Sequence, residues 1–318
     1  MPDLEPPALR ALIEKQAHVI TRAQALRAGL SHHAVSHRLR AGGPWQPLLP
    51  GVYLTVTGKP TQRQRDIAAV LYGGTPAVIT GLAAVRHHRM PGPETDAVDL
   101  LVPARRQCRS VSYVVVHRTT RMPKLAAGSP QASYALPARA VADAARWLTG
   151  LRDVRALVAG AVQSRSCTLD ELAEELRAGP RQDSRLLRAV LAEVQDGILS
   201  VPEAELRDLI IKAKLPLPLF NPRLYLADGT FIARPDAWWP QAGVAIEVDS
   251  KRWHFWDADW ERTMDRHTDL GQYSIVTLHF TPHKIRTEPQ AVIAKMTNAY
   301  NSGIQRPRLP IKAVPARP

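Results

Sequence analysis

The sequence feature that most constrains the fold is an apolar run interrupted by two carboxylates, Val244-Ala245-Ile246-Glu247-Val248-Asp249. Side chains alternate along a β-strand, so Ile246 and Val248 are expected to face a core while Glu247 and Asp249 share the opposite face. A third carboxylate, Asp236, comes shortly before this run. The pattern therefore predicts an α/β domain in which one strand carries two acidic side chains toward a third.

Two local signals precede Asp236. Asp228-Gly229 lies between strand-like runs at 219–226 and 230–233 and favours a tight β-hairpin turn. Ser200-Val201-Pro202-Glu203 is typical of the first turn of a helix. A helix and a hairpin are thus expected to lead into the acidic group.

Carboxylates this close together repel one another, which raises the pKa of at least one of them unless a cation lies between them. A hard divalent ion, Mg²⁺ or Mn²⁺, resolves the repulsion because it binds oxygen ligands. Mg²⁺ held by one or two carboxylates can also bind phosphate oxygens and activate water for phosphodiester cleavage. The acidic group therefore predicts a divalent-metal site that could catalyse phosphodiester cleavage.

The order of these pieces resembles the PD-(D/E)xK restriction-endonuclease-like superfamily and, within it, the very-short-patch-repair-like (Vsr-like) branch. The resemblance covers roughly residues 197–300. The segments that carry it are Ser200-x-x-Glu203, Pro235-Asp236, Glu247-Val248-Asp249, His254, Trp260-x-Arg262-x-x-x-Arg266-His267, and 275–280 followed by Thr281-Pro282. This resemblance implies a restriction-endonuclease-like α/β domain and DNA cleavage.

The resemblance also implies a role for each residue. Asp236 and Glu247 would be the principal metal ligands, with Asp249 beside them. Glu203 would be an outer ligand or would orient a water molecule. His254 would act as the general base or as the acid that protonates the leaving group.

The sequence departs from the family pattern at two points. The Asp-Gly pair that is usual in Vsr-like strands reads Asp249-Ser250 here. Asp249 stands where the E-x-K motif has lysine, and Lys251 follows two residues later. Lys251 could reach back to polarise the attacking water, or it could be an exposed base without a catalytic role.

Each candidate residue also has a purely structural interpretation. Ser200-x-x-Glu203 is a capping box, in which Glu203 satisfies a backbone donor at the helix start. His254 lies among aromatic residues and could be a packed histidine. Asp236 and Glu247 could belong to a buried ion network with Arg234, Arg252, Arg262 or Arg266.

A second pattern, near the N-terminus, is typical of a helix-turn-helix. Thr21 can cap a helix that Gly29 ends, and Ser31 can cap a second helix that ends at Gly42-Gly43. A short hairpin with Pro50-Gly51 at its turn would follow and complete a winged helix. The side chains expected to face the groove or phosphates of double-stranded DNA are Ser31, His32, His33, Ser36, His37, Arg38 and Arg40.

This N-terminal stretch resembles the winged-helix domain of AbiEi-type antitoxins, whose R-G-x-Y-like wing corresponds here to Pro50-Gly51-Val52-Tyr53. The order of elements predicted for 61–125, two helices and then two strands, is also similar to the middle part of AbiEi-like proteins. The resemblance implies binding to double-stranded DNA by the N-terminal domain.

Charge is distributed in a way that suits a polyphosphate partner. The formal net charge is +13, and no acidic residue occurs from Lys15 to Arg65 or from Leu100 to Ala142. The second stretch carries Arg105, Arg106, Arg109, Arg118, Arg121, Lys124 and Arg139. An Arg-rich composition with solvated faces would give the same pattern without a nucleic-acid partner.

Together these patterns predict an α+β multidomain protein. The expected segments are a winged helix-turn-helix domain (1–58), a small α/β module (59–125), a helical linker (126–196), a restriction-endonuclease-like domain (197–303) and a disordered, basic, Pro-rich tail (304–318). Two isolated cysteines, the lack of a signal-like N-terminus and the lack of a run of about 18 apolar residues favour a cytoplasmic protein without membrane contact.

The function expected from the sequence is Mg²⁺-dependent endonuclease activity on DNA. The alternative is a transcriptional regulator or antitoxin-like repressor whose nuclease-like domain is catalytically inactive, which the missing motif lysine favours. The sequence leaves open whether the chain forms a homodimer or binds a cognate partner protein.

Overall fold

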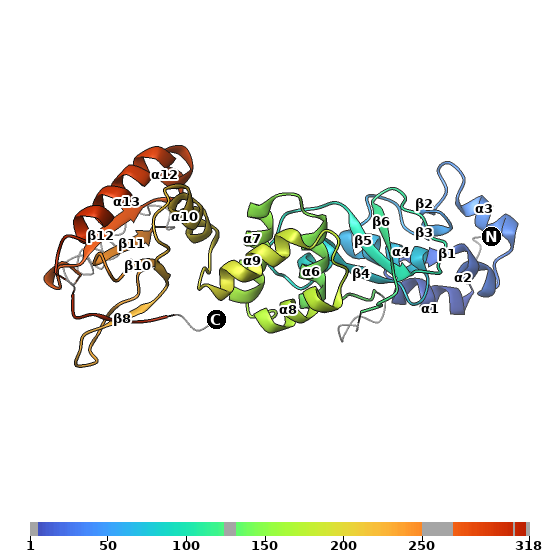
Figure 1. Ribbon diagram of the computed structural model, residues 1–318. Helices are drawn as coiled ribbons and strands as arrows, with labels where there is room; N and C mark the ends of the chain where they lie inside the picture. The colour runs from blue at the N-terminus through green and yellow to red at the C-terminus, as the bar shows by residue number, and fades with distance from the viewer. Residues whose placement is uncertain (1–5, 124–131, 250–269, 308, 316–318) are drawn as a thin grey trace. The chain divides into compact units, whose positions relative to one another are not determined.

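The computed structural model describes residues 6–123, 132–249, 270–307 and 309–315. The chain divides into two compact units, Met1–Leu187 and Arg188–Pro318. Both units mix helices with small open sheets, so the fold is of the α+β type (Figure 1). No helix in the described part of the chain is both long and apolar enough to cross a membrane.

The first unit begins with a compact group of helices and strands. In chain order these are α1 (Pro7–Lys15), β1 (Val19–Thr21), α2 (Arg22–Arg27), α3 (His32–Arg38), β2 (Gln46–Leu49) and β3 (Val52–Leu54). The strands form an antiparallel sheet in the order β1-β3-β2. Thr21 caps α2 through a capping box with Gln24, and Ser31 caps α3, as their positions predicted.

The remainder of the first unit contains a second sheet and three further helices. Its elements are α4 (Gln62–Gly73), β4 (Val78–Thr80), α5 (Gly81–His87), β5 (Val98–Pro103), β6 (Val114–Thr119), α6 (Pro137–Trp147), α7 (Leu151–Gln163) and α8 (Leu169–Ala178). Strand β5 pairs antiparallel with β4 and parallel with β6.

The segment predicted to be a helical linker belongs instead to the packed core of this unit. Helix α6 is joined to the sheet by a buried hydrogen bond from Thr80 Oγ1 to Asp143 Oδ2, at 2.8 Å. Arg139 Nε donates to the same oxygen at 2.7 Å. The linker interpretation was wrong because the polar residues of α6 pair with one another inside the fold rather than with solvent. Helix α9 (Arg185–Gln195) spans the boundary between the two units.

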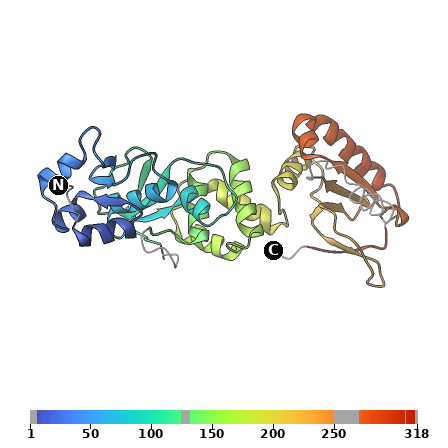
Figure 2. The same cartoon turned by 180° about the vertical axis from the view of Figure 1, so that it is seen from behind.

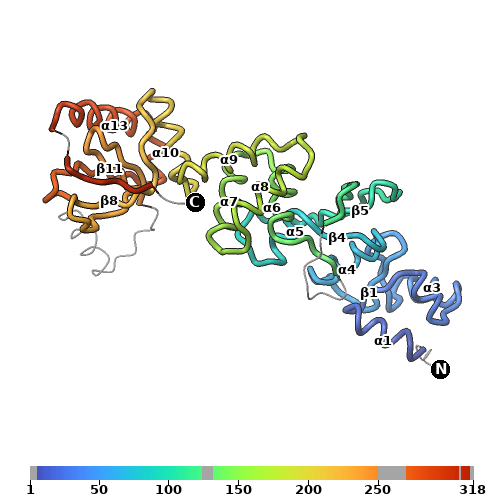
Figure 3. The backbone as a smooth tube through the Cα atoms, turned by 60° about the horizontal axis from the view of Figure 1, so that its bottom comes forward, coloured from blue at the N-terminus to red at the C-terminus, as the bar shows by residue number. Residues whose placement is uncertain are grey.

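The second unit is built on a four-stranded sheet in the order β12-β11-β10-β7. Its strands are β7 (Leu219–Phe220), β10 (Ala237–Trp239), β11 (Val244–Val248) and β12 (Val276–Phe280). Strand β10 runs antiparallel to β7 and β11, whereas β11 and β12 are parallel. Three helices, α10 (Val201–Lys212), α12 (Pro282–Thr287) and α13 (Pro289–Gly303), pack on one face of this sheet (Figure 3).

A smaller sheet, in the order β13-β8-β9, supplies apolar residues to the other face. Strands β8 (Arg223–Tyr225) and β9 (Phe231–Ala233) form the hairpin predicted from Asp228-Gly229. Strand β13 (Lys312–Val314) pairs antiparallel with β8. The C-terminal tail was expected to be disordered; residues 312–314 are ordered because the free edge of β8 accepts them as a third strand.

Candidate functional site

The predicted carboxylates lie where β10 and β11 meet. Ala237 at the start of β10 pairs with Ile246, which brings the preceding residue, Asp236, beside the end of β11. The Val248 backbone N–H donates to Asp236 Oδ2 at 2.6 Å. This hydrogen bond attaches the Asp236 side chain to the strand that carries Glu247.

The alternation predicted for β11 is confirmed. Ile246 and Val248 belong to the core beneath the three helices, whereas Ala245 belongs to the core on the opposite face. Glu247 therefore points to the same side as Ala245, and its side chain is buried. Asp249, one residue beyond the strand, is exposed.

Glu203 approaches the group from the first turn of α10. Its carboxylate accepts hydrogen bonds from the Leu199 backbone N–H at 2.9 Å, from Ser200 Oγ at 2.7 Å and from Asn221 Nδ2 at 2.6 Å. These bonds fix the buried carboxylate at the helix start, which is the structural role that the Ser200-x-x-Glu203 spacing allowed. They also hold a negative charge close to Asp236.

Asn221 is a site residue that the sequence did not reveal. Its backbone N–H donates to the Asp236 carbonyl at 3.0 Å, while its side chain donates to Glu203. Its φ of 51° is in the left-handed region, which asparagine tolerates better than most residues. Asn221 thus connects the strand of Asp236 to the helix of Glu203.

We expect Asn221→Asp to lower the free energy of unfolding by about 2 kcal/mol at pH 8 and by less at pH 4.5. The substitution replaces a donor to Glu203 with a second carboxylate, and the two groups repel most when both are ionised. Urea titrations at the two pH values measure the effect. Asn221→Gly, which removes the donor without adding charge, is the matched control; equal losses at both pH values for Asn221→Asp would contradict the proposed contact.

The electrostatic environment of Asp236 is unusual. Burial, together with the negative charges of Glu203 and Asp249, raises the pKa of its carboxyl to about 6, against the opposing effects of the Val248 N–H and Arg234. The charge of Arg234 lowers the pKa of Asp236, while its Nε donates a hydrogen bond to the Asn221 carbonyl at 3.3 Å. Among the described residues, the effects that raise the pKa of Asp236 therefore outweigh those that lower it.

His279 is the second residue that the sequence did not reveal. It lies opposite Glu247 in the parallel register of β11 and β12. Its Nδ1 lies 3.3 Å from Asp249 Oδ2. The segment 275–280 was part of the family resemblance, but only the pairing of β12 with β11 brings this imidazole to the carboxylates.

Several residues of the predicted acidic site belong to the part of the chain that the structure does not describe. Lys251 and His254 lie outside the described residues, as do Arg252, Arg262 and Arg266. Within the described ranges, no group of three or more His, Cys, Asp and Glu side chains has a spacing that could hold a metal ion.

The predicted DNA-facing side chains lie along one surface of α3 and the turn that follows it. Ser31, His32, His33, Ser36, His37 and Arg40 are exposed. Arg38 is different, because its side chain is buried, its guanidinium lies 5.7 Å from the ring centre of Trp45, and its Nη1 donates to the Ala34 carbonyl at 3.3 Å. The assignment of Arg38 to the exposed surface was wrong: Trp45 folds back over the end of α3 and covers it.

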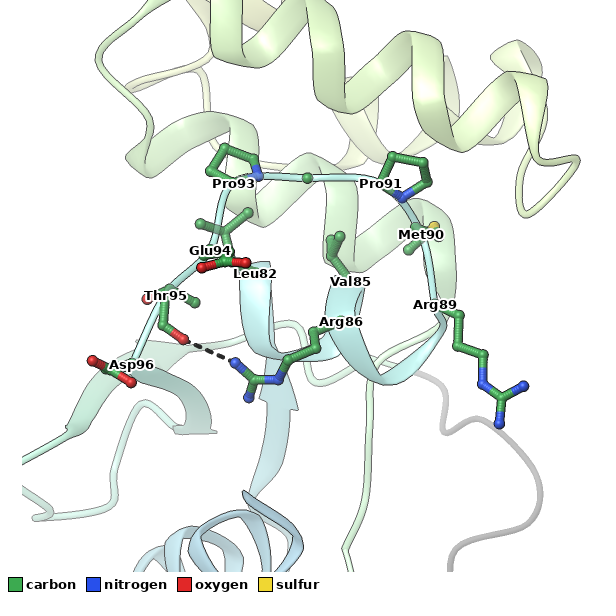
Figure 4. Close-up of a pocket in the computed structure, with 11 residues that line it drawn as sticks. Leu82, Val85, Arg86, Arg89, Met90, Pro91, Pro93, Glu94, Thr95 and Asp96 are labelled. Carbon is green, nitrogen blue, oxygen red and sulfur yellow. Dashed lines mark hydrogen bonds between the residues drawn. The ribbon is translucent and has the colours of Figure 1, made fainter. Parts of the chain in front are cut away.

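A cavity of about 580 Å³ lies elsewhere in the first unit, between α5 and the loop at 89–96. The loop arches over the helix, and Arg86 Nη1 donates to the Thr95 carbonyl at 2.9 Å beneath it (Figure 4). None of the predicted site residues lines this cavity.

No known family model and no curated protein matches the chain. Among solved structures, the chain is similar to the RV2827C protein from Mycobacterium tuberculosis, at 16% sequence identity over 58% of this chain and 74% of that chain, with a TM-score of 0.40. Similarity at this level assigns neither a family nor a function.

Proposed function

We propose that the chain is a DNA-binding protein that hydrolyses phosphodiester bonds with Mg²⁺ or Mn²⁺. The observation that carries the proposal is the half-buried Asp236 carboxylate beside the buried Glu247; the pKa of Asp236 is raised to about 6 by burial and by the charges of Glu203 and Asp249. A half-buried carboxylate next to other acidic side chains is costly to ionise, and binding of a cation recovers that cost.

The donor chemistry fits a hard divalent ion. Asp236, which precedes β10, and Glu247 of β11 would supply oxygen ligands, with Asp249 just beyond the end of β11. Mg²⁺ is usually held by one or two carboxylates together with water and substrate phosphate, so a cage of three protein ligands is not required. Asp236 and Glu247 would hold the ion, and Asp249 would lie beside it.

When bound, the ion would lower the pKa of water and offset the charge that develops on the phosphate. Glu203, held by three hydrogen bonds, would orient a water molecule without changing its own position. Asp249 would orient the His279 imidazole for proton transfer. On this proposal His279 takes the proton-transfer role that the family resemblance assigned to His254.

Double-stranded DNA would be bound by α3. The order α1-β1-α2-α3-β2-β3 suits a winged helix-turn-helix, with the exposed residues of α3 directed to the DNA. The acid-free N-terminal stretch supports the same partner, because phosphate contacts contribute most of the non-specific affinity.

The test is cleavage of supercoiled plasmid and short duplexes by wild type, Glu247→Gln and Glu288→Gln, with Mg²⁺, Mn²⁺ or EDTA. Glu288 is an exposed carboxylate of the same unit and provides the matched control. We expect metal-dependent cleavage by wild type and Glu288→Gln only. Cleavage that persists in Glu247→Gln or in EDTA would contradict the proposed site.

Arg40→Ala and Arg38→Ala are expected to have different effects. Loss of the exposed Arg40 should weaken duplex binding and lower the slope of log K against log salt by about 0.9 without changing stability. Loss of the buried Arg38 should lower the free energy of unfolding by about 1 kcal/mol, since it removes its contact with Trp45. Fluorescence anisotropy titrations and urea unfolding separate the two; an unchanged salt slope for Arg40→Ala would remove that residue from the DNA-binding surface.

The second candidate function is a transcriptional regulator or antitoxin-like repressor with an inactive nuclease-like domain. Two observations favour it: Asp249 replaces the motif lysine, and the Glu203 carboxylate is occupied by hydrogen bonds to protein groups. Tight, salt-dependent duplex binding by wild type, without cleavage under any metal condition, would make this function the better supported one.

A further inference from the structure

The small sheet β13-β8-β9 has one face turned to the core and one turned to solvent. Leu224 and its cross-strand neighbour Ala233 are buried, and they belong to the core that this sheet shares with β10 and β11. Because side chains alternate along each strand, Arg223 and Tyr225 of β8 point to the opposite, outer face. The hairpin of β8 and β9 extends away from the four-stranded sheet (Figures 1 and 2).

A bulge adds a second aromatic ring to this outer face. Leu224 pairs with Ala233, but the next residue, Tyr225, pairs with Phe231 rather than with Ile232. The extra residue, Ile232, packs against the core, and Phe231 is turned to the side of Tyr225. The two ring centres lie 5.7 Å apart with their planes at 68°, and Phe231 is 56% exposed. A β-bulge commonly redirects a side chain in this way.

The same face is positively charged. Lys312 of β13 pairs with Tyr225, and Val314 pairs with Arg223, so Lys312 and Arg223 flank the rings from neighbouring strands. Both basic residues are exposed, and β8, β9 and β13 contain no acidic residue. Exposed aromatic rings between cations on an open sheet suit unpaired nucleobases, which stack on the rings while their phosphates meet the cations.

We propose that the outer face of β13-β8-β9 binds single-stranded nucleic acid, with bases stacked on Phe231 and Tyr225 and phosphates bound by Arg223 and Lys312. This surface is formed by residues other than those of α3 and other than the carboxylates, and binding to it requires no divalent ion. Binding of single-stranded nucleic acid to this face therefore does not depend on phosphodiester hydrolysis.

The experiment measures the affinity of the full chain for a fluorescent oligothymidylate of about 20 nucleotides and for a blunt duplex, both in EDTA. Phe231→Ala is expected to weaken single-strand binding roughly tenfold and duplex binding less than twofold, since one stacked base is lost. Phe231→Trp should retain the affinity. Leu217→Ala removes an apolar side chain that is 52% exposed but lies outside the three strands, and it should change neither affinity.

Arg223→Gln should lower the slope of log K against log salt for the single strand by about 0.7, the value for one phosphate contact. Unchanged single-strand affinity in Phe231→Ala, or equal losses on single strand and duplex, would overturn the proposal. A dimer that dissociates on Phe231→Ala, with unchanged oligonucleotide affinity, would also overturn it by assigning the face to a second copy of the chain. Sedimentation of the same samples measures that outcome.

Discussion

Asp236→Asn is expected to reduce metal-dependent plasmid cleavage by about a thousandfold, because loss of several kcal/mol of charge stabilisation corresponds to that factor. Asparagine has the same shape as aspartate, and its Oδ1 can still accept the hydrogen bond that Val248 donates to Asp236 Oδ2 in the wild type. The substitution therefore removes the negative charge while preserving the junction of β10 and β11. Single-turnover cleavage of a labelled duplex at saturating protein measures the chemical step without the contribution of DNA binding.

The control for this experiment is duplex affinity in EDTA, which should be the same for Asp236→Asn and wild type because the exposed surface of α3 is unchanged. Glu288→Gln should cleave as wild type does. Residual cleavage within tenfold of wild type would show that Asp236 does not hold the ion, even if the chain proved to be a nuclease. Loss of cleavage together with loss of duplex affinity would instead indicate a folding defect.

Local sequence signals predicted those parts of the fold in which neighbouring residues decide the structure. The alternation at 244–248, the hairpin at Asp228-Gly229 and the caps at Thr21 and Ser31 depend on residues within a few positions of one another. In each case, the backbone preference and the hydrogen bond that satisfies it are encoded in one short segment.

The residues that sequence reasoning missed depend on contacts between distant segments. His279 joins the group through the parallel pairing of β12 with β11, and Asn221 reaches Glu203 across 18 positions of the chain. Arg38 appeared to be exposed because its place in the helix does not reveal that Trp45 covers it. The strand β13 was missed because an isolated basic, Pro-rich segment has no reason to be ordered until the edge of β8 is available.

In EDTA, the free energy of unfolding should fall by about 3 kcal/mol, through Asp236 alone, as the pH rises from about 3 to about 7. The folded-state pKa of about 6 lies above the ordinary value of 3.8, so the unfolded carboxyl loses its proton first. Between these values the folded state binds more protons than the unfolded state, and stability decreases as the pH rises. Below about pH 3 both states are protonated and above about pH 7 both are ionised, so the contribution of Asp236 should be level outside this window.

Asp236→Asn should remove this decrease, so that the variant matches wild type at about pH 3 and exceeds it by about 3 kcal/mol at about pH 7.5. Asp228 is the control for the sign of the effect. Hydrogen bonds from Thr230 hold its pKa below the ordinary value, so its contribution to stability decreases as the pH falls rather than as it rises. Addition of Mg²⁺ at pH 7.5 should stabilise wild type and leave Asp236→Asn unchanged, since an ion that binds only the folded state raises its stability. If Mg²⁺ stabilised both proteins equally, the ion would bind elsewhere, and the raised pKa of Asp236 would reflect burial without a metal site.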